Sequence, residues 1–531
     1  MFLKLNLYIP LFLNLLHQIL VTMLNELENS QKRQLLDIME GITKEDSTIE
    51  EKVRHALTNA ELNNILNIVL NRQKTAKSTQ TAFQYEIRGD QYCRQGYLMH
   101  ALSDYNSSII SLKDPYESGK QHLSRVLNKR ADLFLQLNHE FRFVCNMISS
   151  IRYAEIVSWS ELCTACSFIV KIIQTKTRGK WTSNLVDDIK KVQMLITIQE
   201  GGVQYDEDVD DIYDDSKNFY GSYLVVKSSP QKGRYMETTA FIKKNTVIMK
   251  GKVHSLGLDN DLWCYVCARC LSALNYQVFP CYHCIKAWYC SERCCRLDYK
   301  YHRFICNWLE FFDGGLASNV TSASWILVGL NTLTRIGFKR AIEITNNRQM
   351  ANNKEDNNFL QVLDFFRDYN VLKPQAKVIN LLSSTLIIRM LHKDNFLTDF
   401  TQQEMIQLGT LFHQVWDSGI FNTFVSENIV EKIDFTNQRF IKEKRMIGVC
   451  LYLDYTYINH SCVPNVQFMC NKREQFVRAI KDIEAGTEIN GSYGPLKGKE
   501  SLEERRDYFL RNHGFVCQCE GCIEEATTMQ E

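Results

Sequence analysis

Eight cysteine and histidine side chains with the spacing of metal ligands fall between residues 267 and 306. Zinc prefers four-coordinate sites built from Cys and His, and this segment is too short to bury a core of its own. Two zinc ions would therefore supply its folding free energy. The eight expected ligands are Cys267, Cys270, Cys281, Cys284, Cys290, Cys294, His302 and Cys306. Cys264 and Cys295 leave an ambiguity of register, and we treat them as spare thiols.

A second group of side chains suited to chemistry lies between residues 448 and 522. Asn459-His460-Ser461-Cys462 follows a strand-like run and precedes a proline, so it occupies the point where a strand gives way to a turn. Tyr493 follows a later strand-like run, and a Cys-x-Cys-x2-Cys triplet closes the stretch. Taken alone, the first motif is better explained as an ordinary Asx turn, and the tyrosine as a core residue. Their order and spacing point to a shared site.

The combined pattern resembles the SET and MYND domain family of protein lysine methyltransferases, and with its flanking segments the likeness covers most of residues 219–522. The motifs that carry it are Gly448-Val449-x-Leu451-Tyr452, Asn459-His460-Ser461-Cys462-x-Pro464-Asn465, Ile483-x2-Gly486-x-Glu488-Ile489, Tyr493-Gly494-Pro495 and Cys517-x-Cys519-x2-Cys522. The zinc-ligand stretch, with its Tyr289-Cys290-Ser291, is similar to a MYND finger. The N-terminal region resembles that of the family branch that carries tetratricopeptide (TPR) repeats.

The resemblance implies an α+β, multi-domain fold. A helical TPR-like region precedes a β-rich SET domain, which is interrupted by a MYND zinc finger and a helical insert and ends in a zinc-binding post-SET segment. The expected segments are 1–24, an apolar N-terminal stretch; 25–198, helical and TPR-like; 199–218, an acidic linker; 219–256, the first part of the SET domain; 264–306, the finger; 307–447, the helical insert; 448–496, the catalytic part of the SET domain; and 497–531, the post-SET segment.

Residues 24–198 have apolar positions at intervals of three and four, which is the period of a helix. Gly89 and Ala101 stand among tyrosines with the spacing of a TPR helix pair, in which small residues let two helices approach and tyrosines fill the space between them. A second unit begins near Leu127. A generic helical hairpin is the alternative interpretation.

Three other features of the N-terminal half are given simpler interpretations. The first twenty-four residues are apolar but interrupted by Pro10 and by polar residues, and no small-residue cleavage site follows. We therefore favour a packed helix, or an upstream extension, over a signal peptide or membrane anchor. Residues 206–215, seven of them acidic, are expected to be a solvated linker. Cys163 and Cys166 lack partner ligands and are expected to be buried thiols.

By likeness to the family, the finger ligands interleave. One zinc ion would be held by Cys267, Cys270, Cys290 and Cys294, and a second by Cys281, Cys284, His302 and Cys306. SET folds thread their C-terminal segment through a preceding loop, one of the rare exceptions to the rule against threading. That arrangement would bring together Cys462, Cys517, Cys519 and Cys522. These four would form a closed third zinc site that pins the post-SET segment over the active site.

The resemblance assigns the reaction to Tyr493, whose hydroxyl would lie at the point of methyl transfer with Phe515 as a wall beside it. Asn459 and His460 would present backbone and amide groups to S-adenosylmethionine. Methyl transfer requires a neutral amine, whereas a free lysine has a pKa of about 10.4. A narrow aromatic channel next to a positively charged cofactor disfavours the ammonium form. Enforced alignment lowers the barrier further.

Two further segments would contact the cofactor. Lys232-Gly233-Arg234 corresponds to the glycine-rich strip of the family, where a bare backbone lets the amino-acid end of the cofactor approach. Phe421-Asn422-Thr423-Phe424 resembles the insert motif in which the asparagine, here Asn422, contacts the cofactor. Tyr235 stands where the family has a second glycine, and this departure bears directly on cofactor binding.

Composition narrows the class of protein. With 62 Lys and Arg against 61 Asp and Glu, the formal net charge is +1, so no global field favours nucleic acid. Most of the 19 cysteines have zinc-like spacings, which favours a reducing compartment, the cytoplasm or nucleus, over a secreted disulfide-linked protein. We expect a monomer without membrane association. Its expected partners are a protein substrate with a lysine side chain, and peptides that bind the finger or the TPR-like region.

Two functions follow from these observations. The first is an S-adenosylmethionine-dependent protein lysine N-methyltransferase acting on histone or non-histone proteins. The second, motivated by Tyr235, is a catalytically weak scaffold that binds protein partners through its finger and TPR-like region, because fold alone does not fix function. Many family members carry a large helical domain after the post-SET zinc, whereas this sequence ends at Glu531. Part of the substrate cleft would then be absent or supplied by residues 24–198.

Overall fold

The computed structural model of the protein describes residues 27–71, 76–153, 219–259, 262–274, 278–312, 322–365, 374–471 and 473–528. The expected apolar segment 1–24, the acidic stretch 206–215, and Cys163 and Cys166 lie outside these residues. The described residues pack around three hydrophobic cores. Within the described part of the chain, no helix combines the length and the apolar character needed to cross a membrane.

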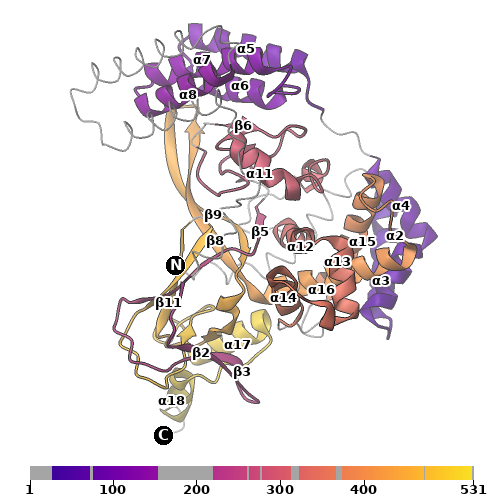
Figure 1. The fold of residues 1–531 in the computed structure, drawn as a ribbon, viewed down its shortest axis with the longest axis vertical. Coiled ribbons are helices and arrows are strands. Elements are labelled where there is room, and N and C mark those ends of the chain that lie inside the picture. Colours follow the sequence, from indigo (N-terminus) through magenta and orange to yellow (C-terminus); the bar gives the residue numbers. More distant parts are fainter. Residues whose placement is uncertain are drawn as a thin grey trace.

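The N-terminal helices fall into two groups that lie at different places on the molecule (Figure 1). The first group consists of α2 (Asn29–Lys44), α3 (Ile49–Thr58) and α4 (Ala60–Leu70). Helices α2 and α3 pack on two later helices, α15 (Pro374–Lys393) and α16 (Gln402–Asn422). Arg389 donates to Leu57 O at 3.0 Å, and Lys393 donates to Asn71 Oδ1 at 2.7 Å. The sequence predicted helices here but did not indicate this division.

The second group is a stack in which each helix packs on the next: α5 (Thr79–Arg94), α6 (Leu98–Ser111), α7 (Lys120–Gln136) and α8 (Glu140–Tyr153). A methyl group added to Gly89 would lie 2.7 Å from Tyr105 Cε1, so only a glycine allows α5 to approach α6 this closely. Ala131 and Phe134 of α7 are fully buried. The predicted close approach at Gly89 is therefore present, and the assignment of these helices to TPR repeats stays a prediction.

Small sheets form the SET region. Its first strands and its central strands are β1 (Phe219–Tyr220), β2 (Leu224–Ser229), β3 (Gly233–Thr238), β4 (Val247–Lys252), β5 (Ser255–Leu258), β11 (Val466–Asn471) and β12 (Glu474–Ala479). The main sheet has the order β1-β4-β12-β11, so segments more than two hundred residues apart in sequence pair with each other. In β12 fully buried positions alternate with half-buried ones, as expected for a strand with one face in the core. β2 and β3 form a hairpin whose turn reaches Gly233, where φ is +64°.

The finger lies between β5 and the insert helices. It consists of the short strands β6 (Phe279–Pro280) and β7 (Trp288–Tyr289) and the helix α11 (Glu292–His302). Ser291 caps α11 by accepting a hydrogen bond from the amide of Cys294 at 3.2 Å, which fixes where that helix begins. Tyr116 of the helical stack donates to Pro280 O at 2.8 Å, so the finger is joined to the stack.

The insert, predicted to be helical over residues 307–447, is helical only in part. Its helices are α12 (Ser322–Ile336), α13 (Phe338–Asn346), α14 (Lys354–Leu363), α15 and α16. Residues 423–447 instead belong to a long hairpin of β8 (Thr423–Asp434) and β9 (Arg439–Leu451). Lysines and glutamates of this segment pair across the two strands, as in the ion pairs Lys432–Glu443 and Lys444–Glu427, both at 2.7 Å.

The hairpin extends from the SET region to the helical stack (Figure 1). At its tip, Gln438 Oε1 accepts a hydrogen bond from the amide of Met99 at 3.1 Å. Further along β9, the Arg142 guanidinium of α8 lies 4.6 Å from the centre of the Phe440 ring and pairs with Glu431 of β8. Because these contacts are polar and aromatic and come from both strands, they fix the hairpin to the stack.

Candidate active site and metal centres

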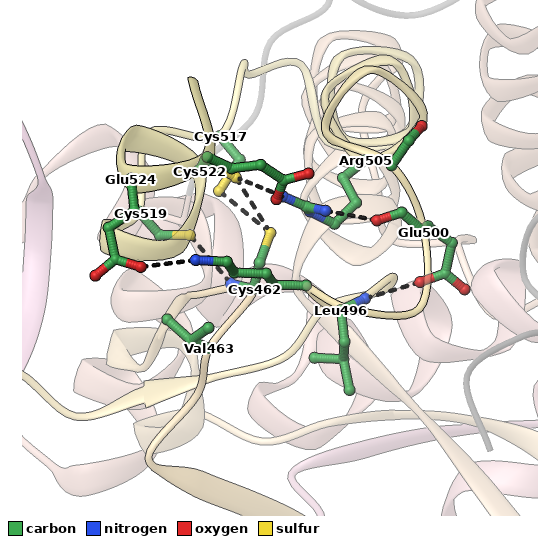
Figure 2. A network of polar contacts seen from close by, with 12 residues as sticks. Cys462, Val463, Leu496, Glu500, Arg505, Cys517, Cys519, Cys522 and Glu524 are labelled. Atoms are coloured by element: carbon green, nitrogen blue, oxygen red, sulfur yellow. Dashed lines mark hydrogen bonds and ion pairs between the residues drawn. The ribbon is translucent and has the colours of Figure 1, made fainter. Parts of the chain in front are cut away.

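The four predicted post-SET ligands, Cys462, Cys517, Cys519 and Cys522, meet at one point (Figure 2). The Sγ atom of Cys462 lies 3.7 Å from that of Cys517 and 3.5 Å from that of Cys522. The amide of Cys462 donates to Cys519 Sγ at 3.3 Å. Tetrahedral zinc with bonds of about 2.3 Å places its sulfur atoms about 3.8 Å apart, whereas a disulfide places them about 2.0 Å apart. The sulfur spacing therefore fits a metal site.

Two helices position the C-terminal ligands: α17 (Leu502–His513) and α18 (Glu520–Thr528). Ser501 and Glu504 form a capping box that starts α17. Gly514 ends α17 in the left-handed conformation, with φ at +73°, and so turns the chain toward Cys517. A local turn then presents Cys519 and Cys522 together, since the amide of Cys522 donates to Cys519 O at 2.9 Å.

The finger gathers its ligands into the two interleaved sets that the family resemblance implied: Cys267, Cys270, Cys290 and Cys294, and Cys281, Cys284, His302 and Cys306. In the second set, His302 Nε2 lies 3.2 Å from Cys281 Sγ and 3.4 Å from Cys284 Sγ. Zinc bonds of about 2.0 Å to nitrogen and 2.3 Å to sulfur place these atoms about 3.5 Å apart. Neither Cys264 nor Cys295 belongs to these two sets.

Tyr493 and the Asn-His motif are neighbours, as the threaded SET arrangement requires. Strand β10 (Asn459–His460) pairs in parallel with β13 (Asn490–Gly491), with His460 opposite Gly491. The amide of Tyr493 donates to His460 Nδ1 at 3.0 Å, and the Tyr493 hydroxyl donates to Ile458 O at 2.6 Å. Burial, and then the Glu488 carboxylate, raise the pKa of Tyr493, so its hydroxyl is protonated at neutral pH.

His460 joins the tyrosine to the post-SET thiols. Burial lowers the pKa of His460 to about 3, so the ring is neutral at physiological pH. Because Nδ1 accepts the amide hydrogen of Tyr493, the single ring proton belongs on Nε2. That nitrogen lies 3.4 Å from Cys462 Sγ and can donate to it. One imidazole therefore contacts both the proposed reacting residue and a proposed metal ligand.

One face of α17, which was not predicted from the sequence, closes the site. Arg505, Phe509 and His513 are four residues apart, which places them on the same side of the helix. The Phe509 ring lies 4.0 Å from the His460 ring, and the His513 ring lies 5.5 Å from that of Tyr493. The predicted wall residue Phe515 stacks on Phe509 at 5.5 Å. The spacing of four was the signal that could have revealed these residues.

The predicted cofactor strip and the Asn-His motif converge around Glu488, another residue that the sequence analysis did not assign to the site. The Asn459 side-chain amide donates to Lys232 O and to Glu488 Oε1, both at 3.2 Å. Lys232 Nζ pairs with Glu488 Oε2 at 2.6 Å. Gly233 is exposed, and no atom lies within 4 Å of the position that its Cβ would occupy. The strip thus has an open backbone next to polar groups.

The other predicted contacts lie around this centre. Arg234 lies 5.3 Å from the centre of the Tyr457 ring and donates to Asp364 O at 3.0 Å, so it joins β3 to α14. Tyr235 is half-buried, with Lys232 Nζ 5.0 Å from the centre of its ring. Asn422 ends α16, and its amide donates to Ser418 O within that helix at 2.8 Å.

Aromatic rings connect the end of α16 to the core of the site. Phe424, two residues after Asn422, lies 5.1 Å from the Phe468 ring of β11. A Cβ on Gly491 would lie 2.4 Å from Phe468 Cε2, so the backbone of β13 passes directly against that ring. The rings of Phe424 and Phe468 thus connect the end of α16 to β13.

Comparison with known proteins places this geometry in a family. Residues 233–494 match the SET domain. The chain is 23% identical over 317 residues to a SET and MYND domain-containing protein of Dictyostelium discoideum, a match that covers 56% of this chain and 60% of the relative. It is 24% identical over 306 residues to Histone-lysine N-methyltransferase ASHR1 of Arabidopsis thaliana, covering 56% and 55%. The chain contains a SET domain and is similar to SET and MYND domain proteins.

A third relative is Protein-lysine N-methyltransferase SMYD4 of Pongo abelii, which is 22% identical over 373 residues, covering 56% of this chain and 46% of the relative. The chain spans about half the length of these curated relatives. The matched SET region includes the strip at Gly233, the motif at Asn459 and His460, and Tyr493.

Proposed function

We propose that the protein is an S-adenosylmethionine-dependent protein lysine N-methyltransferase acting on histone or non-histone proteins. The observation that carries this proposal is the parallel pairing of β10 with β13, which joins the amide of Tyr493 to His460 Nδ1 at 3.0 Å. The names of the relatives, which are histone-lysine and protein-lysine methyltransferases, support the same reaction.

S-adenosylmethionine, when bound, supplies a methyl group on a sulfonium for in-line attack by a neutral lysine amine. The residues that would hold it are Lys232, Gly233 and Arg234 of the strip, Asn422, Asn459, His460, Tyr493 and Phe515. The open backbone at Gly233 and the amide of Asn459 fit the amino-acid end of such a ligand. A neutral His460 next to Tyr493 adds no positive charge to a site that receives a sulfonium.

Tyr493 would act on the amine. Its protonated hydroxyl and the carbonyl of Ile458, 2.6 Å apart, form a polar pair among aromatic rings. A carbonyl there can accept a hydrogen bond from the substrate amine, and the surrounding rings disfavour its charged form. Alignment of the amine with the methyl group would then supply on the order of several kcal/mol of the barrier reduction.

We also infer that three zinc ions stabilise the chain, one at each of the three ligand sets. Thiolates and imidazole are the donors that zinc prefers, and the sulfur spacing fits tetrahedral coordination. Reduced thiolates belong in the cytoplasm or nucleus, which is where we expect the protein to act. The finger and the TPR-like stack of α5–α8 would bind peptides of partner proteins.

The scaffold function is the second candidate because Tyr235 occupies a position that is glycine in the family. Its ring lies under Lys232 on the strand that borders the strip. A catalytically weak scaffold would bind no cofactor, whereas the enzyme would bind the cofactor even with Tyr235 beside the strip. Replacement of Tyr235 by glycine would then restore binding only if the tyrosine is the obstacle.

The deciding experiment measures S-adenosylmethionine binding by calorimetry and methyl transfer to a peptide and protein library. Wild type, Asn459→Ala and Tyr235→Gly are compared, each with its zinc content measured. We expect wild type to bind and to transfer, and Asn459→Ala to lose affinity on the order of tenfold, since one amide hydrogen bond is worth about 1 kcal/mol. Fully zinc-loaded wild type that binds no cofactor would contradict the enzyme and favour the scaffold.

A further inference from the structure

A fully buried arginine lies against the post-SET cysteines. The side chain of Arg505 has no exposed surface. Its Nη2 lies 3.7 Å from Cys522 Sγ and 2.7 Å from Glu525 Oε2, and its Nη1 donates to Glu500 O at 2.5 Å (Figure 2). A buried guanidinium is costly unless its charge is compensated nearby. Glu525 already balances the positive charge of Arg505, so the contact of the guanidinium with Cys522 Sγ must have another cause.

That cause is the negative charge of the four cysteine sulfur atoms. Four thiolates around one zinc ion carry about two net negative charges. Hydrogen bonds to the sulfur atoms spread this charge, and two neutral groups are placed to donate: the amide of Cys462, to Cys519 Sγ, and His460 Nε2, to Cys462 Sγ. Among the contacts of the described residues, the guanidinium of Arg505 is the one full positive charge at a sulfur of this set.

Other charges near the set are directed elsewhere. Lys497 Nζ pairs with Glu524 at 2.6 Å, and the backbone amide of Lys497 donates to Cys462 O at 3.1 Å. Glu525 is largely buried and faces Arg505 from α18, so it holds the guanidinium in place from the opposite helix. Arg505 therefore joins α17, α18 and the sulfur atoms in one contact network.

We propose that Arg505 is a positioning residue of the post-SET metal centre: it offsets the charge of the thiolates and so sets how tightly this site holds its metal. This inference rests on the proposed zinc site at Cys462. It also has a structural consequence, because Arg505 and Phe509 share one face of α17. Loss of the guanidinium contact loosens the helix that holds Phe509 4.0 Å from the His460 ring.

The test uses the full chain and two independent readouts of the metal. The first is the rate at which a colorimetric chelator removes zinc. The second is the spectrum of the cobalt-substituted protein, in which the thiolate-to-cobalt charge-transfer band reports the environment of the sulfur atoms. The variants are Arg505→Gln, Arg505→Lys and Glu525→Gln. Arg511→Gln is the matched control, since Arg511 is on the same helix with a side chain that is 66% exposed.

We expect Arg505→Gln to release one zinc equivalent faster, on the order of 10- to 100-fold, as for the loss of other groups that hold metal ligands. The other two equivalents should keep their rate. Arg505→Lys retains the charge without the planar fork and should be intermediate. Glu525→Gln keeps the charge of Arg505 but weakens the contact that holds it, and should have a smaller effect. The charge-transfer band of Arg505→Gln should move to longer wavelength, because the sulfur lone pairs lose a stabilising cation.

A folded Arg505→Gln protein with three slowly released equivalents and an unshifted band would overturn the proposal. If Arg505→Gln does not fold, the test uses Arg505→Lys and Glu525→Gln. Zinc release at the wild-type rate in both of these variants would also overturn the proposal. Wild type that holds only two zinc ions would instead remove the third site itself. The failure of the metal assignment is thus distinguishable from the failure of the role of Arg505.

Discussion

The two polar groups of Tyr493 have different partners, and this separates its structural role from its chemical role. Its amide is held by His460, so the backbone position does not depend on the hydroxyl. The hydroxyl donates to Ile458 O and lies in a site lined by the rings of His460 and His513. A change of the hydroxyl alone therefore leaves the surrounding geometry in place.

Tyr493→Phe should lower turnover by roughly one to three orders of magnitude, scaled from the loss of one preorganised polar group. Affinity for S-adenosylmethionine should change little, because the fold of the site is retained. Steady-state methyl transfer and calorimetry on the same protein check both parts. Tyr508→Phe is the control, since it removes a hydroxyl from a neighbouring buried ring of α17. Equal turnover of Tyr493→Phe and wild type would refute the assignment.

His254 gives a prediction about pH. Burial, and then the Arg335 guanidinium, hold the pKa of His254 well below its usual value of about 6.5. Below that pH the unfolded chain takes up a proton that the folded chain does not, so the free energy of unfolding falls as pH falls. The limiting slope from one such histidine is about 1.4 kcal/mol per pH unit. Urea unfolding of wild type between pH 7.5 and 5.5 should be steeper in pH than that of His254→Gln, and parallel curves would exclude this role.

At the scale of elements, local patterns predicted the strand-like run before Asn459, which is the end of β9, because apolar runs and turn residues are short-range signals. Residues 423–447 of the β8–β9 hairpin were predicted as part of the helical insert, whereas in the structure their partners lie on the opposite strand. The face of α17 was also not identified. The side chains of this face belong to the site only because the threaded arrangement brings them against His460, about fifty residues earlier in the sequence.

The α5–α6 contact can be tested with two glycines in helices. Gly89→Ala places a methyl group 2.7 Å from the Tyr105 ring and should destabilise the stack by about 1–3 kcal/mol through overpacking. Gly41→Ala in α2 has no atom within 4 Å and should stabilise by about 0.5–1 kcal/mol through helix propensity. Hydrogen exchange of α5–α6 and of α2 reads the two effects separately. Protection of α5–α6 that is unchanged in Gly89→Ala would show that the helices do not need this close approach.

At the scale of the whole molecule, the family motifs predicted the order of the parts and all three ligand sets. They did not predict how the parts are joined. The contacts of α3 with α16, of Tyr116 with Pro280 and of Met99 with Gln438 link residues 164 to more than 300 positions apart. Single-residue patterns carry no information about such pairs, so the division of the N-terminal helices into two groups became visible only in the structure.

The three ligand sets predict the metal content of the whole chain. Elemental analysis of unstripped protein should give three zinc ions, and Cys462→Ser should give two, because one of four ligands of a single set is lost. Hydrogen exchange should then rise in residues 510–525 and stay unchanged in the finger. A wild-type content of two or fewer would remove the post-SET site, and faster exchange in the finger of Cys462→Ser would show that the sets are not independent.

The β8–β9 hairpin has a mechanical consequence. One end of β9 is clamped by Arg142 at Phe440, and the other end, at Leu451, is buried in a core and lies eight residues before Asn459. Paired strands are stiff along their length, so the hairpin transmits to its base part of any force on α5–α8, alongside the contact of Tyr116 with the finger. A large ligand that pulls on α5–α8 would therefore also strain the segment of chain between Leu451 and Asn459.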